Sequence, residues 1–257
     1  MEWINLLLII ISGYIIGAFV HELGHVFIGL INGWKLTFLV VGPLGIRRDE
    51  HGDIKIYFEK NVMLWGGVAG TLPTNEKENN IDIWKNILIA GPIASIILGL
   101  ISIPLGLYLN NMFWGILGAM AIGMGIASVL PFPIKTGIGY IDGYRWKRLK
   151  NKSDNVGYME EVALFRFVEF EHFNKSFQNF DSDYIRFLKQ SKYPIIQLYG
   201  LYAEYKYYLS IEDHINLKTV EDEMENIKSK TPKFIYDSFK SNLHKLKTAA
   251  NNTYNSL

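Results

Sequence analysis

Two histidines and a glutamate interrupt an apolar stretch near the N-terminus, in the segment GAFVHELGHVFIGL. His21 and His25 are four residues apart, so on a helix both imidazoles lie on one face and can bind the same metal ion. Glu22 lies about 100° further around the helix, beside such an ion, where its carboxylate can accept a proton from a metal-bound water. The spacing therefore predicts a hydrolytic metal site with His21 and His25 as ligands and Glu22 as the general base.

The surroundings of these three residues strengthen this interpretation. The apolar stretch runs from about residue 3 to residue 31, and about 20 apolar residues are enough to span a bilayer. An ionisable side chain inside a span costs about 3 kcal/mol on insertion scales and marks a functional site. We therefore favour a metal site over a chance match or polar contacts between helices.

Two further apolar segments, about 87–109 and 112–130, are also long enough to span a membrane. Basic residues gather between the first and second spans and after the third, whereas the opposite ends carry none. The positive-inside rule then places the N-terminus outside and both basic segments in the cytoplasm. His21 lies roughly 26 Å beyond the outer end of the first span at 1.5 Å per residue. This depth is near the cytosolic face, where water can reach the site.

Rows of small residues recur on all three predicted spans. Such rows let helices approach closely and would shield a polar site from lipid. The row on the first span includes both histidines. In chain order, the rows on the three spans are Gly13, Gly17, His21, His25 and Gly29; then Gly91, Ser95 and Gly99; then Gly115, Ala119, Gly123 and Ala127.

Composition divides the chain into two parts. Residues 86–130 contain no Asp, Glu, Lys or Arg, whereas residues 150–257 are dense with them. This contrast predicts a transmembrane domain at 1–149 and a cytosolic α-helical domain of four or five helices at 150–257. The net charge of +1 gives no indication of nucleic-acid binding. There is no cysteine, so a metal site must use nitrogen and oxygen ligands.

The predicted fold is membrane α-helical, with three transmembrane helices, a cytoplasmic membrane-associated β-hairpin and a C-terminal α-helical soluble domain. The β region covers about residues 35–73. Alternation and β-branched residues predict strands at 36–41 and 54–58, joined by a turn at 49–52. The glycine-broken segment that follows, to Pro73, is expected to be an interfacial loop or an edge strand.

A catalytic zinc site needs a third protein ligand and an open position. Pro131 and Pro133 break the third span, and Gly137 and Gly139 allow the backbone to turn before Asp142. We expect Asp142 to be this ligand. Three rivals lie in the predicted hairpin turn or in the C-terminal domain and would have to fold back to the site: His51, Glu169 and His172.

The sequence resembles the site-2 proteases, zinc metalloproteases that cleave within membranes. The resemblance rests on HELGH in the first span, AGPIAS in the second and the Pro…Asp-Gly element after the third, and covers about residues 3–145. It implies a metalloprotease core with one Zn²⁺ per chain bound by His21, His25 and Asp142, with Glu22 as general base. It also implies that the β region, including Gly66 and Gly67, presents substrate as an added strand.

The sequence departs from the family pattern at two positions. Ser95 and Ser128 stand where the family usually has asparagine, and the gap from Pro131 to Asp142 is longer than in many members. By resemblance Ser95, Ser128, Gly66 and Gly67 are candidate substrate-binding residues. For the two serines, a role as small packing residues is an equal alternative.

The function predicted from these features is hydrolysis of peptide bonds in or near transmembrane segments of membrane-protein substrates, in regulated intramembrane proteolysis. Two alternatives remain open: a membrane-embedded zinc peptidase that cuts peptides at the cytosolic face, and an inactive pseudoprotease that binds membrane clients. The expected partners are a membrane-protein or membrane-anchored peptide substrate, the lipid bilayer and a cytosolic regulator bound by the C-terminal domain. No nucleic-acid partner is expected.

Overall fold

The computed structural model describes residues 2–49, 51–135, 139–153 and 155–254. The chain forms two compact units, of which the first ends at Lys152 and the second begins at Ser153. The described residues are mostly helical and include one small antiparallel sheet.

Three helices of the first unit are long and apolar enough to cross a membrane, as predicted: α1 (Glu2–Ile31), α2 (Asn80–Tyr108) and α3 (Met112–Val129). α2 begins before the predicted span because a polar turn carrying Asp82 and Lys85 continues the helix beyond the apolar segment. Between α2 and α3, Asn110 takes a positive φ of 48° and the Asn111 side chain accepts a hydrogen bond from the Phe113 N–H. These two asparagines therefore form the tight helical hairpin.

The small-residue row on α2 faces neighbouring helices, as predicted, and on α1 Gly13 and Gly17 lie against α3 whereas Gly29 lies against Thr71 of the sheet. Gly91, Ser95 and Gly99 are all buried on α2. The prediction for α3 was wrong, because Ala119, Gly123 and Ala127 are exposed.

The face of α3 that packs against α2 carries Gly118, Ala121 and Gly125 instead. A Cβ atom at Gly118 would lie 2.6 Å from the Ile103 side chain, and one at Gly125 would lie 2.8 Å from the Pro92 carbonyl oxygen. Small residues line two faces of α3, and the fit to the side chains of α2 determines which of the two faces packs against that helix.

The β region forms a four-stranded antiparallel sheet with the order β3-β2-β1-β4. The strands are β1 (Lys35–Val41), β2 (Leu44–Arg48), β3 (Ile54–Phe58) and β4 (Val68–Leu72). The predicted hairpin of 36–41 with 54–58 is therefore corrected, because β2 lies between them and the turn at 49–52 joins β2 to β3. Gly42 has a φ of 55° in the tight β1–β2 turn, and Gly45 leaves room for the Tyr57 ring. These two glycines therefore allow the turn and the close packing that β2 needs.

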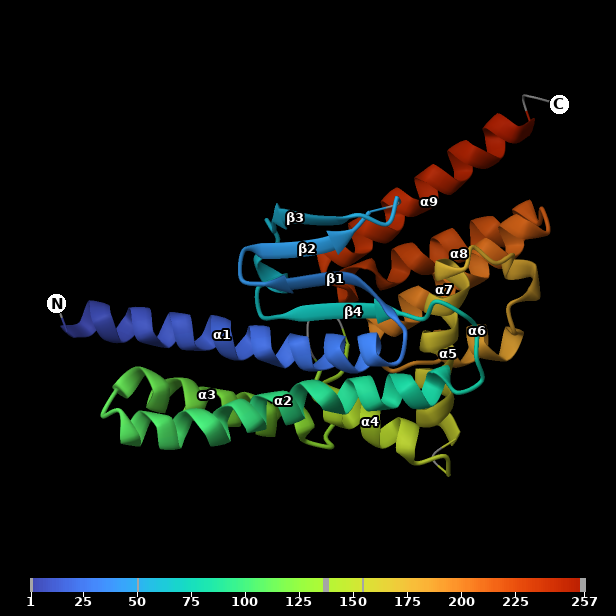
Figure 1. The fold of residues 1–257 in the computed structure, drawn as a ribbon. Coiled ribbons are helices and arrows are strands. Elements are labelled where there is room, and N and C mark those ends of the chain that lie inside the picture. Colours follow the sequence, from blue (N-terminus) through green and yellow to red (C-terminus); the bar gives the residue numbers. More distant parts are fainter. Residues whose placement is uncertain (1, 50, 136–138, 154, 255–257) are drawn as a thin grey trace. The chain divides into compact units, whose positions relative to one another are not determined.

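The sheet lies along one side of α1, and the α2–α3 hairpin lies along the other (Figure 1). The Tyr14 hydroxyl donates a 3.4 Å hydrogen bond to the Gly66 carbonyl. Further along α1, Gly29 allows close contact with the Thr71 side chain, because a Cβ atom there would overlap it. These contacts hold β4 beside the α1 segment that carries His21, Glu22 and His25.

A short helix, α4 (Asp142–Lys150), follows the third span. The Ile141 N–H donates to the Ile134 carbonyl at 3.2 Å. A Cβ atom at Gly143 would overlap the Val129 carbonyl group. The glycine of the Asp-Gly pair therefore lets α4 begin against the end of α3, and this position determines where Asp142 lies.

The second unit contains five α-helices among its described residues. They are α5 (Asn155–His172), α6 (Ser182–Lys189), α7 (Pro194–Ser210), α8 (His214–Ile227) and α9 (Lys233–Tyr254). Buried aromatic rings join them, and Phe167 contacts Phe177 and Tyr202 while Tyr202 contacts Phe239. These aromatic residues form a hydrophobic core, as their helical spacing predicted.

Candidate active site

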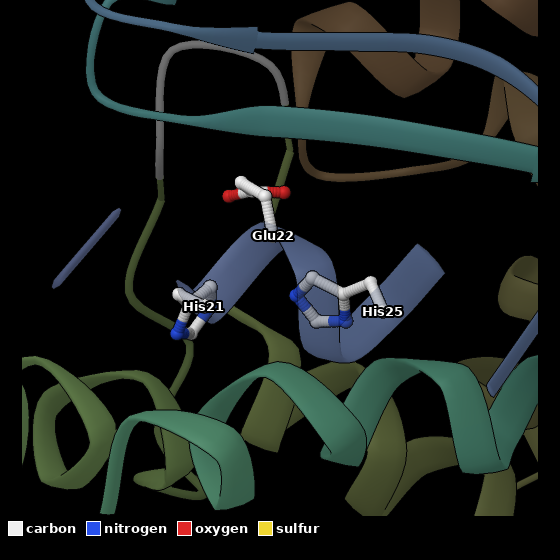
Figure 2. Close-up of side chains that lie close together, drawn as sticks. All are labelled: His21, Glu22 and His25. Atoms are coloured by element: carbon white, nitrogen blue, oxygen red, sulfur yellow. The ribbon is translucent and has the colours of Figure 1, made fainter. Parts of the chain in front are cut away.

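His21, Glu22 and His25 lie in one turn of α1 and form a compact group. His21 and Glu22 are buried, and His25 is half-buried. Potential ligand atoms of the three side chains lie within 4.8 Å of one another. Figure 2 shows the two imidazoles on the side of α1 that faces α2, and the Glu22 carboxylate on the side that faces β4. The carboxylate thus stands beside the imidazole pair, as the spacing predicted.

The orientation of His25 is determined by α2. Its Nδ1 lies 2.7 Å from the Ile87 carbonyl oxygen. Because a carbonyl only accepts hydrogen bonds, Nδ1 carries the proton and the Nε2 lone pair is available to a metal. One turn along α2, Gly91 makes room for the ring, since a Cβ atom there would overlap the imidazole. The glycine of AGPIAS is therefore needed for the position of His25.

His21 is held in a similar way. Its Nδ1 lies 2.9 Å from the Ser95 Oγ, and this contact is buried. The Nε2 atoms of His21 and His25 both face the side chain of Asp142. The structure therefore brings together the three residues that the sequence analysis expected to bind zinc.

Asp142 reaches the imidazole pair from the first turn of α4. Its Oδ2 lies 3.3 Å from His21 Nε2 and 3.6 Å from His25 Nε2, and its side chain is 24 % exposed. Burial alone would raise the pKa of this carboxyl group, but the neighbouring imidazoles of His25 and His21 outweigh it. The pKa of Asp142 is consequently held below its ordinary value, and the group is a carboxylate at neutral pH.

These distances can be tested against the geometry of a zinc site. Two ligand atoms bound to tetrahedral zinc at about 2.0–2.1 Å are themselves about 3.3–3.4 Å apart. The two separations between imidazole nitrogen and carboxylate oxygen, 3.3 and 3.6 Å, agree with this value. Two imidazoles and one carboxylate are also a donor set that zinc prefers. The donor set and the two histidine–aspartate separations therefore fit a zinc ion.

The Glu22 side chain packs against the start of β4. Gly67 has a φ of 107°, and a Cβ atom there would lie 2.8 Å from Glu22 Oε1. The Ala69 backbone also forms a hydrogen bond with the Glu22 carboxyl group. Gly67 was expected to contact substrate, and the structure places it against the predicted general base.

The other candidate substrate-binding residues occupy different surroundings. Ser95 contacts His21, as described above, and Gly66 accepts the hydrogen bond from Tyr14. Ser128 is half-buried near the end of α3. A substrate contact by any of them remains a prediction.

The three rival ligands belong to other elements of the chain. His51 lies in the exposed turn between β2 and β3. Glu169 and His172 lie on α5 in the second unit, where Glu169 pairs with Arg166. Gly137, expected to help turn the chain toward Asp142, lies outside the described residues.

Two features of the site were not predicted from the sequence. The Ile87 carbonyl is a backbone group, so no side-chain pattern indicates that it orients His25. The contact of Gly67 with Glu22 depends on how the sheet packs against α1. The one signal for it in the sequence is the Gly66–Gly67 pair, whose predicted role is a substrate contact.

A buried His-Glu-x-x-His turn with a convergent carboxylate, set among helices able to cross a membrane, defines a membrane metallopeptidase. The family model of Peptidase family M50 matches residues 7–256, and the chain therefore belongs to this family of zinc-dependent site-2-type proteases. The match confirms the resemblance and extends it through the C-terminal unit. Neither a curated protein nor a solved structure matched the chain.

Proposed function

We propose that this protein is an intramembrane zinc metalloprotease that hydrolyses peptide bonds in or near transmembrane segments of membrane proteins. The observation that carries the proposal is that Asp142 Oδ2 lies 3.3 Å from His21 Nε2 and 3.6 Å from His25 Nε2, separations suited to ligands of one zinc ion. Membership of the family supports metallopeptidase activity in general. The location among three membrane-type helices supports substrates within the bilayer.

In the proposed mechanism His21, His25 and Asp142 bind zinc, and Glu22 transfers protons. When bound, zinc lowers the pKa of a coordinated water toward about 7 and polarises the scissile carbonyl. The Glu22 carboxylate accepts a proton from the attacking water and then delivers it to the leaving amine. His21 and Glu22 are buried by the surrounding elements, and the partly exposed Asp142 leaves a side from which water can approach.

Substrate binding is proposed at the free edge of β4. A substrate helix hides its carbonyls in internal hydrogen bonds, so cleavage requires local unwinding, and pairing with a strand edge replaces the lost bonds. β1 is excluded from this role because it pairs with β2 and β4 on its two sides. β3 has a free edge but is separated from β4 by two strands. No described strand pairs with the outer edge of β4, and β4 lies next to Glu22, which favours it over β3.

The membrane orientation and the role of the second unit belong to the same proposal. The basic residues of α4 and of the segment before α2 favour a cytoplasmic location for that end of the helices. The second unit would then be cytosolic and available to a regulator. Regulated cleavage of a membrane-anchored substrate is consistent with that arrangement.

The proposal is tested by reconstituting the purified chain in liposomes with two synthetic single-span peptides. One has a polyleucine span, and the other has the same span with a central Gly-Pro pair that weakens the helix. We expect about one zinc per chain, as the three-ligand site predicts. We also expect cuts inside the weakened span, located by mass spectrometry, that stop when a chelator removes the metal.

Other outcomes separate the alternative functions. Cuts confined to the flanking peptide segments would support a peptidase that acts at the cytosolic face. Stable capture of the peptide by the zinc-loaded protein without any cleavage would support a pseudoprotease. Either result would overturn the proposed intramembrane protease.

The contact between Gly67 and Glu22 yields a separate prediction. Gly67→Ala should slow peptide cleavage about 100-fold, because a misplacement of about 1 Å near the reacting groups has an effect of that size. Zinc content should not change. Gly52→Ala is the matched control, since Gly52 has a similar φ of 90° but no atom within 4 Å of its Cβ position. Equal cleavage rates for the two variants would show that Gly67 does not position Glu22.

A further inference from the structure

Ser95 occupies an unusual position for a hydroxyl group within a membrane-type helix. It is 0 % exposed, and its Oγ lies 2.9 Å from Nδ1 of His21. We propose that Ser95 is a positioning residue that accepts the Nδ1 proton of His21 and thereby keeps Nε2 free to bind the metal. This inference rests on the proposed zinc site and assigns Ser95 to the metal centre instead of to substrate binding.

The argument starts from the two neutral forms of imidazole. A neutral histidine carries one ring proton, either on Nδ1 or on Nε2, and only the bare nitrogen can bind a metal. For His21, Nε2 faces Asp142 Oδ2 at 3.3 Å. If the proton were on Nε2, it would form a hydrogen bond with this carboxylate. His21 Nε2 and Asp142 Oδ2 would then be hydrogen-bonded to each other, and His21 Nε2 would have no lone pair for the metal.

Ser95 favours the other form of His21. A serine oxygen carries two lone pairs and can therefore accept a hydrogen bond from an imidazole N–H. The Nδ1 proton of His21 then has a buried acceptor at 2.9 Å. Such partners of metal-binding histidines fix both the ring orientation and the protonated nitrogen.

The same face of α2 orients both histidines. Ile87, Gly91 and Ser95 follow one another at intervals of four residues and therefore lie on one side of the helix. Ile87 accepts from His25, Gly91 makes room for that ring, and Ser95 contacts His21. A single face of α2 thus orients both imidazoles so that their Nε2 atoms are available to the metal. Among the described contacts, Ser95 is the only residue of this face whose side chain hydrogen-bonds to one of the two histidines.

The test is the affinity for zinc, measured by chelator competition on the purified chain in detergent. Ser95→Ala should weaken zinc binding about 10- to 100-fold, the usual effect of removing such a partner. Ser102→Ala is the matched control, because Ser102 is equally buried on α2 (1 % exposed) and no contact joins it to the histidines. This control should bind zinc as the unmodified chain does.

Two further measurements separate positioning from loss of structure. The metal-free Ser95→Ala and Ser102→Ala proteins should unfold at similar temperatures, and Ser95→Thr, which keeps the hydroxyl, should recover most of the zinc affinity. The visible spectrum of bound Co²⁺ should change in Ser95→Ala but not in Ser102→Ala, because only the first alters how His21 is presented.

His21→Ala separates failure of this inference from failure of the proposed function. If His21→Ala abolishes zinc binding and Ser95→Ala does not weaken it, the positioning role is wrong while the metal site stands. The role is also wrong if Ser95→Ala slows cleavage at saturating zinc with unchanged affinity, because Ser95 would then act on the substrate. Undiminished zinc binding by His21→Ala would overturn the metal site itself.

Discussion

Replacing Glu22 by glutamine should abolish peptide hydrolysis while leaving the chain folded and able to bind zinc. The amide has nearly the same shape as the carboxylate but cannot accept a proton from the attacking water. Loss of a general base typically slows a reaction about 10²- to 10⁴-fold. Glu22 faces β4 and not the contact of the imidazoles with Asp142, so the ligand set remains intact. Two measurements on the same preparation check this prediction. Cleavage of the weakened single-span peptide tests the loss of hydrolysis, and the zinc content tests whether metal binding is retained.

Glu78→Gln is a suitable control for this experiment, because Glu78 is an exposed residue in the polar connector before α2. It should cleave the peptide at the unmodified rate. Full activity of Glu22→Gln would refute the proposed mechanism. Loss of zinc together with activity would show that Glu22 is a metal ligand.

Asp142→Asn should remove both zinc binding and activity. The amide is uncharged and a weaker metal ligand than the carboxylate, so only the two histidines remain as strong ligands. Loss of a hydrogen-bond partner of a metal ligand already lowers the metal affinity by up to about 100-fold, so loss of the ligand itself should lower the zinc affinity by more than this. Zinc titration by chelator competition measures the change, and cleavage should fall with it.

The comparison variant is Asp82→Asn. Asp82 pairs with Lys85 at the start of α2 and is largely exposed, so its replacement should leave zinc binding unchanged. Retention of stoichiometric zinc by Asp142→Asn would mean that a different side chain is the third ligand. His51 would then be the first residue to replace, since it belongs to the same unit.

Local spacing was sufficient to predict much of this site. The interval between His21 and His25 places two imidazoles on one helix face wherever that helix lies, and their cost in a membrane segment indicates function. Asp142 is distant in sequence, but the helix-breaking prolines and the Asp-Gly pair indicated where the chain returns. The structure shows these three side chains in contact.

Other features depend on packing and could not be predicted from spacing. Both faces of α3 carry small residues, so its contact with α2 is decided by side chains such as Ile103. β2 was missed because Gly42 and Gly45 are typical of loops, whereas here one permits a tight turn and the other accommodates Tyr57. The role of Ser95 depends on which residue faces it across the helix pair. Such information is absent from any single segment.

The position of α4 has a mechanical consequence. This helix has nine residues, which makes it about 13 Å long. One end carries the carboxylate that faces the two imidazoles, and the other end leads within three residues to the second unit, which begins at Ser153. α4 is therefore the short helix that connects Asp142 in sequence to the start of the second unit. A shift of α4 along its axis would move Asp142 relative to the two imidazoles, so the strength of metal binding would depend on where this helix lies.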